Sequence, residues 1–159
     1  MLEEAVAITV ELRRVLDAEV ERARLERTAL RSLDSDRIFS GAAARAAFNA
    51  DVATLESRLA DALAKAAGHF GLSEVSLARL SERAPAETAA LSRALGDVRA
   101  LAAALAELDR LNLILAGRAL ACVQSYLTAL QPSASAYDRR GFRTAAGQAV
   151  RRGTTWSKV

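Results

Sequence analysis

The sequence contains very few of the side chains from which catalytic and metal sites are usually built. His69 is the only histidine and Cys122 the only cysteine among 159 residues. His69 lies beside Gly68, where the C-terminal cap of a helix is expected. We find no spacing of His, Cys and carboxylate side chains typical of a metal site and no Gly-rich phosphate loop. The sequence therefore indicates a protein that is not an enzyme, with no catalytic residues, no metal and no cofactor.

A single cysteine cannot form an internal disulfide, and its apolar neighbours predict that Cys122 is a small buried core residue in a reducing compartment. Glu3 and Glu4 precede the first apolar residues, a pattern unlike that of a signal peptide. The uncharged run after Arg118 meets Pro132 before it reaches the length of a membrane span. We therefore expect a cytoplasmic protein without membrane insertion.

Aromatic residues are also scarce, at 4% of a chain that is 52% hydrophobic. The core must consequently be built from leucine, valine and alanine, which favours close-packed helices over a β-sandwich or barrel. A chain of 159 residues is long enough for one domain with a core and too short to argue for two. The composition thus predicts a single all-α domain.

Charge is distributed unevenly along the chain. Residues 131–159 contain six basic residues and one acid, a net charge of +5, whereas residues 1–130 contain 16 basic and 18 acidic residues, a net charge of −2. We expect a helical bundle over 1–130 and a flexible basic tail over 131–159. The tail also contains Tyr137, Phe142 and Trp156. Basic and aromatic residues together are compatible with nucleic acid, although these charges are scattered and an acidic protein partner fits equally well.

Apolar residues recur at helical spacing in three long tracts separated by turn-forming residues. The predicted helices are 3–33, 41–69, a short segment within 76–83, and 86–130. Ser40 is the expected N-cap of the second helix, and Pro85 opens the last helix at its first turn. The tracts predict an elongated antiparallel bundle or coiled coil of three main helices, of which the last is the longest.

The last tract carries an unbroken heptad seam. Its positions alternate in steps of four and three: Ala94, Val98, Leu101, Leu105, Leu108, Asn112, Leu115, Ala119, Cys122 and Tyr126. Such a seam indicates coiled-coil-like packing against partner helices. Asn112 interrupts the apolar seam, with Asp109 and Arg110 close by. A buried asparagine fixes the register of a coiled coil; alternatively, these polar residues mark where internal packing gives way to recognition of a partner helix.

In the second alternative, the C-terminal half of the last helix forms a groove for an amphipathic helix. The candidate binding residues are Leu111, Asn112, Leu115, Val123, Tyr126, Leu127 and Leu130. The heptad position of Tyr126 makes it a packing residue. A different class of function also fits the seam, namely a structural coiled-coil protein that self-associates through the last helix.

Over essentially its whole length, the chain resembles the FlgN-type flagellar export chaperones. That family has a long first helix, a second helix with a short connector, and a long last helix with an "LNxxN" pair of asparagines. The corresponding segment here is "LDRLNLIL", Leu108–Leu115, and "YDRRG", Tyr137–Gly141, matches the family's "YxxxG" at the start of the tail. The first asparagine of the pair is replaced by Asp109, so only Asn112 matches.

The resemblance implies a cytoplasmic helical chaperone that binds the C-terminal helical segments of hook–filament junction proteins. It would prevent their premature polymerisation and deliver them to the cytosolic domain of the flagellar type III export gate. Tyr137 matches the tyrosine that docks the loaded complex on the gate, and the export ATPase complex is a further candidate partner. If the asparagine pair hydrogen-bonds the client, Asp109 changes what is accepted.

Overall fold

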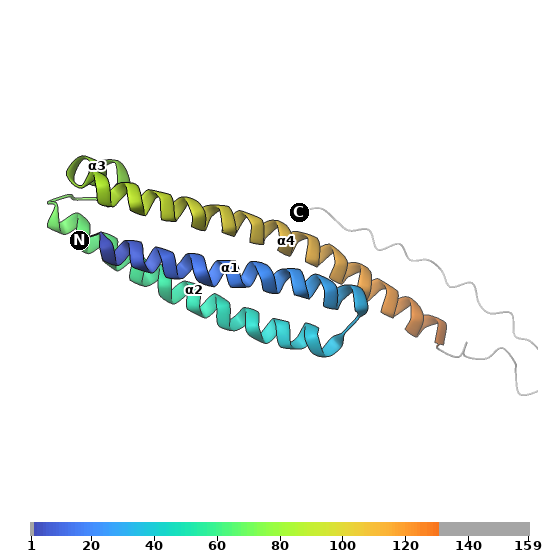
Figure 1. The fold of residues 1–159 in the computed structure, drawn as a ribbon. Helices are drawn as coiled ribbons and strands as arrows, with labels where there is room; N and C mark the ends of the chain where they lie inside the picture. Colours follow the sequence, from blue (N-terminus) through green and yellow to red (C-terminus); the bar gives the residue numbers. More distant parts are fainter. Residues whose placement is uncertain (1, 131–159) are drawn as a thin grey trace, which may run out of the picture. The chain divides into compact units, whose positions relative to one another are not determined.

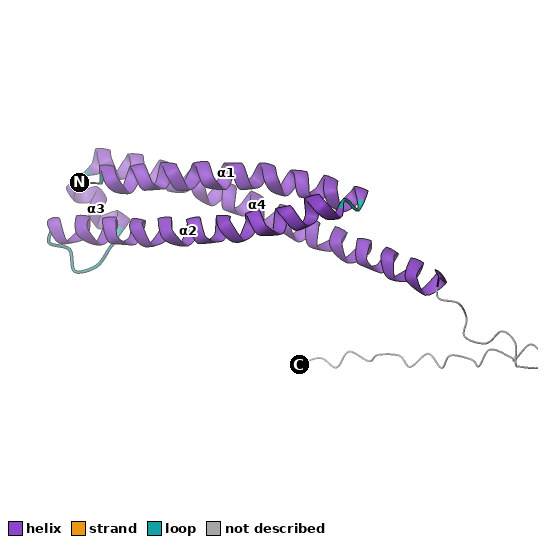
Figure 2. Cartoon of the chain, turned by 90° about the horizontal axis from the view of Figure 1, so that it is seen from below, coloured by secondary structure: helices purple, strands orange, loops and turns teal. Residues whose placement is uncertain are grey.

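A computed structural model of the protein describes residues 2–130, which form four helices and no strand (Figures 1 and 2). The helices are α1 (Glu3–Ser32), α2 (Ser35–His69), α3 (Leu77–Arg83) and α4 (Pro85–Leu130). The prediction of an all-α fold is thus confirmed. By its contacts the chain divides into the units Met1–Ala121 and Cys122–Val159, and the bundle described below is the first of these. Within it, α2 runs antiparallel to α1, and α4 runs in the same direction as α1 (Figure 1).

The turn between α1 and α2 is very short. Leu33 ends α1 in the left-handed conformation, with φ of 55°, and its N–H donates to the carbonyl of Ala29. Asp34 then caps α2, because its side chain accepts a hydrogen bond of 3.1 Å from the N–H of Arg37. Leu33 thus ends α1, and the next residue, Asp34, caps the start of α2. This short turn reverses the chain, so that α1 and α2 pack antiparallel.

The prediction for the start of α2 was wrong. The helix begins at Ser35 instead of Gly41, and the expected cap, Ser40, lies inside it with its Oγ donating to the carbonyl of Arg37. Asp34 already supplies the cap, and no proline between residues 35 and 40 interrupts the helix. Gly41 is accommodated in the helix interior. The expected extents of α1, α3 and α4 agree with the structure to within one or two residues.

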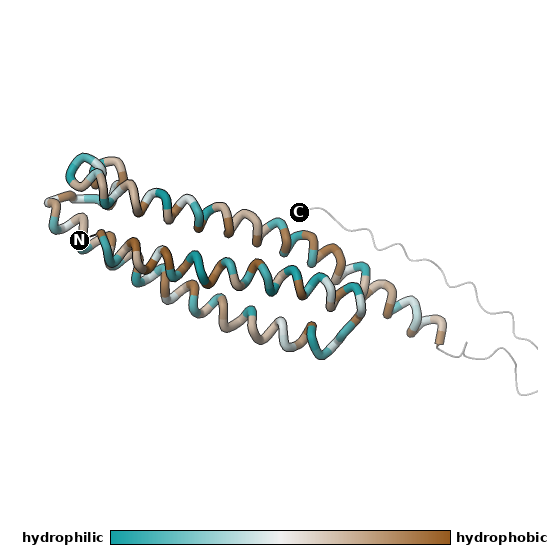
Figure 3. The backbone as a smooth tube through the Cα atoms, viewed as in Figure 1, coloured by the Kyte–Doolittle hydropathy of each residue, from teal (hydrophilic) through white to brown (hydrophobic). Residues whose placement is uncertain are grey.

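The core lies where the apolar faces of α1, α2 and α4 meet. Figure 3 shows hydrophobic residues, in brown, recurring along α1 and α4. Buried core residues include Ile8, Leu12, Leu16, Val20, Phe48, Leu55, Leu91 and Leu105. Nearly all of them are aliphatic, as the scarcity of aromatic residues predicts. The aliphatic side chains recur at helical spacing on each helix, so each helix buries one stripe.

One end of this bundle is closed by the chain itself. Leu80 of α3, Leu2 and Leu91 are all 0% exposed and belong to the same core cluster. The N–H of Leu2 donates to Oε2 of Glu87 at 2.9 Å, and this hydrogen bond lowers the pKa of the Glu87 carboxyl. The short helix α3 therefore acts as a lid over the first turns of α1 and α4.

The heptad seam of α4 is confirmed as its inner face only in part. Leu105 and Asn112 are buried, and Leu115 and Ala119 are half-buried, but the next seam residue, Cys122, is exposed. The expected burial of Cys122 was therefore wrong. The physical reason is that α1 ends at Ser32, only two residues after Leu30, which lines the same cleft as Ala116.

Candidate functional site

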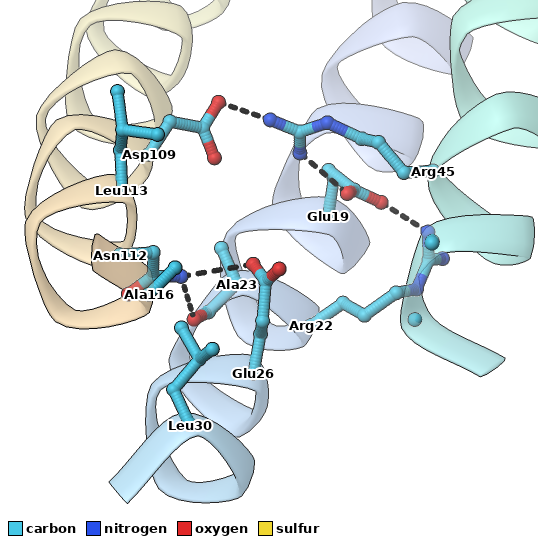
Figure 4. A pocket seen from close by; sticks show the side chains of 12 residues that line it. Glu19, Arg22, Ala23, Glu26, Leu30, Arg45, Asp109, Asn112, Leu113 and Ala116 are labelled. Carbon is cyan, nitrogen blue, oxygen red and sulfur yellow. Dashed lines mark hydrogen bonds and ion pairs between the residues drawn. The ribbon is translucent and has the colours of Figure 1, made fainter. Parts of the chain in front are cut away.

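Asn112 lies in a buried polar layer between α4 and α1, and its side chain is only 4% exposed (Figure 4). Its Nδ2 donates to the carbonyl of Ala23 at 2.8 Å and to Oε2 of Glu26 at 2.9 Å. Its Oδ1 accepts from Nε of Arg27 at 3.4 Å. The amide is thus bonded to three residues of α1, which is the arrangement expected of a seam asparagine that fixes the register of two helices.

Asp109 connects α4 to α2 through an ion pair with Arg45 (Figure 4). Arg45 also donates through Nη1 to Oε1 of Glu19 on α1, at 2.5 Å, and Arg22 pairs with the other carboxylate oxygen of Glu19. Glu19 is only 2% exposed, so its charge needs these partners. Burial alone would lower the pKa of Arg45, but the hydrogen bond to Glu19 and the charge of Asp109 raise it above its ordinary value.

Arg110 differs from its two polar neighbours because it faces solvent. It forms two hydrogen bonds to Glu107, one turn earlier on α4, at 2.9 and 2.7 Å, and these lower the pKa of the Glu107 carboxyl. An exposed pair of this kind contributes little to stability. Of the residues that interrupt the seam, Asp109 and Asn112 therefore hold α4 to the other helices, whereas Arg110 does not.

Next to this polar layer, α1, α2 and α4 enclose an open cleft of about 390 Å³. Its charged lining consists of Glu19, Arg22, Glu26, Arg45 and Asp109, described above. The apolar lining comes from all three helices: Ala23, Leu30, Gly41, Ala42, Leu113 and Ala116. Among the residues that the structure describes, no cluster of three or more His, Cys, Asp or Glu side chains is arranged to hold a metal ion.

The structure separates the predicted binding residues into two groups. Asn112 is buried, and Leu111 and Leu115 are half-buried beside it. The others are exposed on the last turns of α4: Val123 (41%), Tyr126 (69%), Leu127 (58%) and Leu130 (77%). Tyr126, expected to be a packing residue, is therefore exposed in the part of the chain that the structure describes. Tyr137 and the rest of the predicted basic tail lie outside the described residues.

Sequence reasoning missed two exposed leucines on α4. Leu113 is 75% exposed and Leu120 is 59% exposed, and Leu127 follows at the same spacing. Residues seven apart on a helix lie on nearly the same face, so these three leucines form a strip beside the seam. The signal was present in the sequence as a second heptad repeat, but the more regular seam through Asn112 obscured it.

Comparison with protein families settles the relationship of the chain. The family model described as "FlgN protein" matches residues 1–149, which is most of the sequence. The chain belongs to the FlgN family. No curated protein and no solved structure matches it at a significant level. Family membership makes this FlgN-family chain a flagellar chaperone, a protein that acts by binding other flagellar proteins.

By length and composition alone, α4 qualifies as a helix that could cross a membrane, and none of the qualifying segment is buried. The sequence argument expected no span because polar residues such as Gln124 and Ser125 interrupt the apolar run. A single such helix is weak evidence for a membrane span. In a chaperone family, an exposed apolar helix is the kind of surface that binds other helices.

Proposed function

We propose that this FlgN-family protein is a cytoplasmic type III export chaperone for hook–filament junction proteins. Its client would be the C-terminal helical segment of such a protein, held on the exposed apolar face at the end of α4. The observation that carries this proposal is the change along one continuous helix, from buried Leu105 and Asn112 to exposed Val123, Tyr126 and Leu127. An apolar stripe left exposed on a helix is what an amphipathic partner helix covers.

The energetics suit a reversible chaperone. Fully burying one aliphatic side chain is worth about 1.5–3 kcal/mol, so covering several half-exposed side chains contributes several kcal/mol. Ordering a disordered client segment costs about 2–5 kcal/mol or more, which offsets much of this gain. Moderate affinity follows, and it allows release at the export gate. In this proposal the junction proteins assemble through the same apolar stripe of the client segment, so that covering the stripe prevents premature polymerisation.

In this proposal the predicted binding residues have different roles. Val123, Tyr126, Leu127 and Leu130 contact the client directly. Leu111 and Leu115 contribute from the packed side of the helix, and Asn112 supports the surface by holding α4 in register against α1, through its bonds to Ala23 and Glu26. Leu111, Asn112 and Leu115 therefore affect client binding mainly by positioning α4.

Delivery to the export gate is assigned to Tyr137, on the strength of its family-like "YDRRG" context. The gate's cytosolic domain would be the docking partner, with the export ATPase complex as a further candidate. We expect Tyr137→Ala to abolish export of the client while leaving its binding affinity unchanged. Normal export by that variant would show that the docking assignment is wrong.

The test of client binding is calorimetric titration with a C-terminal peptide of a hook–filament junction protein. Val123→Glu and Val10→Glu form a matched pair, because both valines are helical and partly exposed, at 41% and 51%. Val123 lies on the proposed surface, whereas Val10 lies on α1. We expect Val123→Glu to abolish binding and Val10→Glu to retain it. Absence of binding by the folded wild-type protein would refute the proposal.

Self-association through the same surface is a second candidate, because the exposed strip of Leu113, Leu120 and Leu127 has the heptad spacing of a coiled coil. Sedimentation of the free protein distinguishes the two functions. A chaperone gains mass when the client peptide is added, whereas a structural coiled coil has a multiple of the 16.9 kDa chain mass on its own.

A further inference from the structure

The open cleft of Figure 4 has the form of an unfilled position in a helical bundle. Its walls are Gly41 and Ala42 on α2 and Ala116 on α4, and α1 contributes Leu30. A Cβ atom added at Gly41 would meet nothing within 4 Å. Walls of small residues let a further helix approach to the 8–10 Å spacing of packed helices. A helix placed there would complete a four-helix arrangement with α1, α2 and α4.

The cleft opens onto apolar side chains that remain uncovered in the described chain. Leu113, which lines the cleft, is 75% exposed, and Leu120, one heptad later on the same face of α4, is 59% exposed. The cleft and the strip are therefore one surface within the first unit of the chain. An occupant must supply apolar side chains at helical spacing to cover both.

The charges of the lining indicate a further feature of the occupant. Three carboxylates (Glu19, Glu26 and Asp109) face two guanidinium groups (Arg22 and Arg45), so the lining carries a net charge of −1. Glu19 is paired with Arg22 and Arg45, and Asp109 is paired with Arg45, whereas Glu26 accepts a hydrogen bond from the neutral amide of Asn112. The excess negative charge of the lining therefore lies at Glu26. The Arg45–Asp109 ion pair links α2 to α4 and closes the cleft at that end.

We propose that this cleft receives the end of the client's amphipathic helix, which packs between α2 and α4 and places a lysine or arginine near Glu26. This inference rests on the proposed function and adds to it a contact surface on three helices of the first unit, the cleft with Leu113 and Leu120. The client helix would have leucine-like side chains at i, i+3 or i+4, and i+7, followed by the basic residue. The Arg45–Asp109 pair then sets how far the client helix can enter.

Ala42 and Ala43 provide a closely matched test. Both are exposed residues of α2 and adjacent in sequence, but Ala42 lines the cleft and Ala43 does not. Tryptophan at position 42 fills the cleft from its wall without disturbing the core. In titration with the junction-protein peptide, we expect Ala42→Trp to weaken binding by about tenfold or more, and Ala43→Trp to leave it unchanged. Equal affinities of the two variants would overturn the inference.

Glu26→Gln tests the charge separately, because the glutamine retains an oxygen that accepts the hydrogen bond from Asn112. We expect weaker binding of the peptide and a smaller dependence of affinity on salt concentration. Unchanged affinity and unchanged salt dependence would show that no basic residue of the client binds near Glu26, and this part of the inference would be wrong. Circular dichroism of each variant establishes that the bundle is intact.

The outcomes separate this inference from the proposed function. Loss of binding in Val123→Glu together with normal binding in Ala42→Trp would leave the chaperone function standing and exclude the cleft. No binding by the wild-type protein would refute both. If the free protein is a dimer that Ala42→Trp converts to a monomer, the cleft belongs to a second copy of the chain, and the inference is likewise overturned.

Discussion

The two ends of the bundle in the first unit contain similar apolar side chains, but these are buried at one end and exposed at the other. At one end, α3 covers Leu2 and Leu91 with Leu80, and all three leucines are 0% exposed. At the other end, around the α1–α2 turn, Phe39 and Leu113 are each 75% exposed. Apolar side chains therefore contribute to folding where α3 covers them, and in our proposal they bind the client where the chain leaves them exposed.

The largest change in the free energy of unfolding should come from truncating a leucine at the covered end, compared with truncating one at the exposed end. Leu80→Ala removes a fully buried side chain and should lower the free energy of unfolding by about 2–5 kcal/mol. Leu113→Ala removes an exposed one and should change it by no more than about 0.5 kcal/mol. Urea denaturation measures both values. Equal losses would show that the two ends are packed alike.

The Leu113→Ala variant should instead lose affinity for the client peptide, because its side chain lies at the mouth of the cleft. Leu80→Ala, studied at a temperature where it is still folded, should bind normally.

An intermediate effect is expected at the polar layer. Asn112→Ala leaves buried polar groups of α1 unpaired, and we expect a loss of about 1–3 kcal/mol in the free energy of unfolding. Gln124→Ala, at an exposed amide on the same helix, is the control and should have little effect. Unchanged stability of Asn112→Ala combined with lost client binding would contradict the register role and assign Asn112 to the client.

The smallest effect concerns the backbone at the two turns. Leu33, at the open end, has a φ of 55°, and Gly71, after α2 at the closed end, has a φ of 67°. Left-handed conformations cost residues with a Cβ about 1–2 kcal/mol, a cost that glycine avoids. Leu33→Gly should therefore raise the melting temperature slightly, and Gly71→Leu should lower it. A lower melting temperature for Leu33→Gly would mean that the leucine side chain stabilises the turn.

The sequence predicted the long helices because local signals define them. Pro85 marks the start of α4, and the spacing of apolar residues marks its length and inner face. It did not predict the start of α2, where Asp34 and Ser40 were both acceptable caps and the choice depends on whether Ser35 and its neighbours continue the helix.

Burial along the seam could not be predicted from its pattern. Asn112 and Tyr126 occupy equivalent heptad positions, two heptads apart, yet Asn112 is 4% exposed and Tyr126 is 69% exposed, because burial depends on where α1 ends. The pairing of Asp109 with Arg45 was also hidden, since the two residues lie 64 positions apart and only the packing of α2 beside α4 joins them. Asp109, which departs from the family asparagine, therefore has a charged partner within the bundle.

Cysteine alkylation can show whether the client covers the end of α4. Because Cys122 is the only cysteine, Cys122→Ser provides a background for Val123→Cys on α4 and for Val10→Cys on α1. With saturating junction-protein peptide, we expect slower alkylation at position 123 and an unchanged rate at position 10. Equal rates at position 123 with and without bound peptide would contradict the proposed client site.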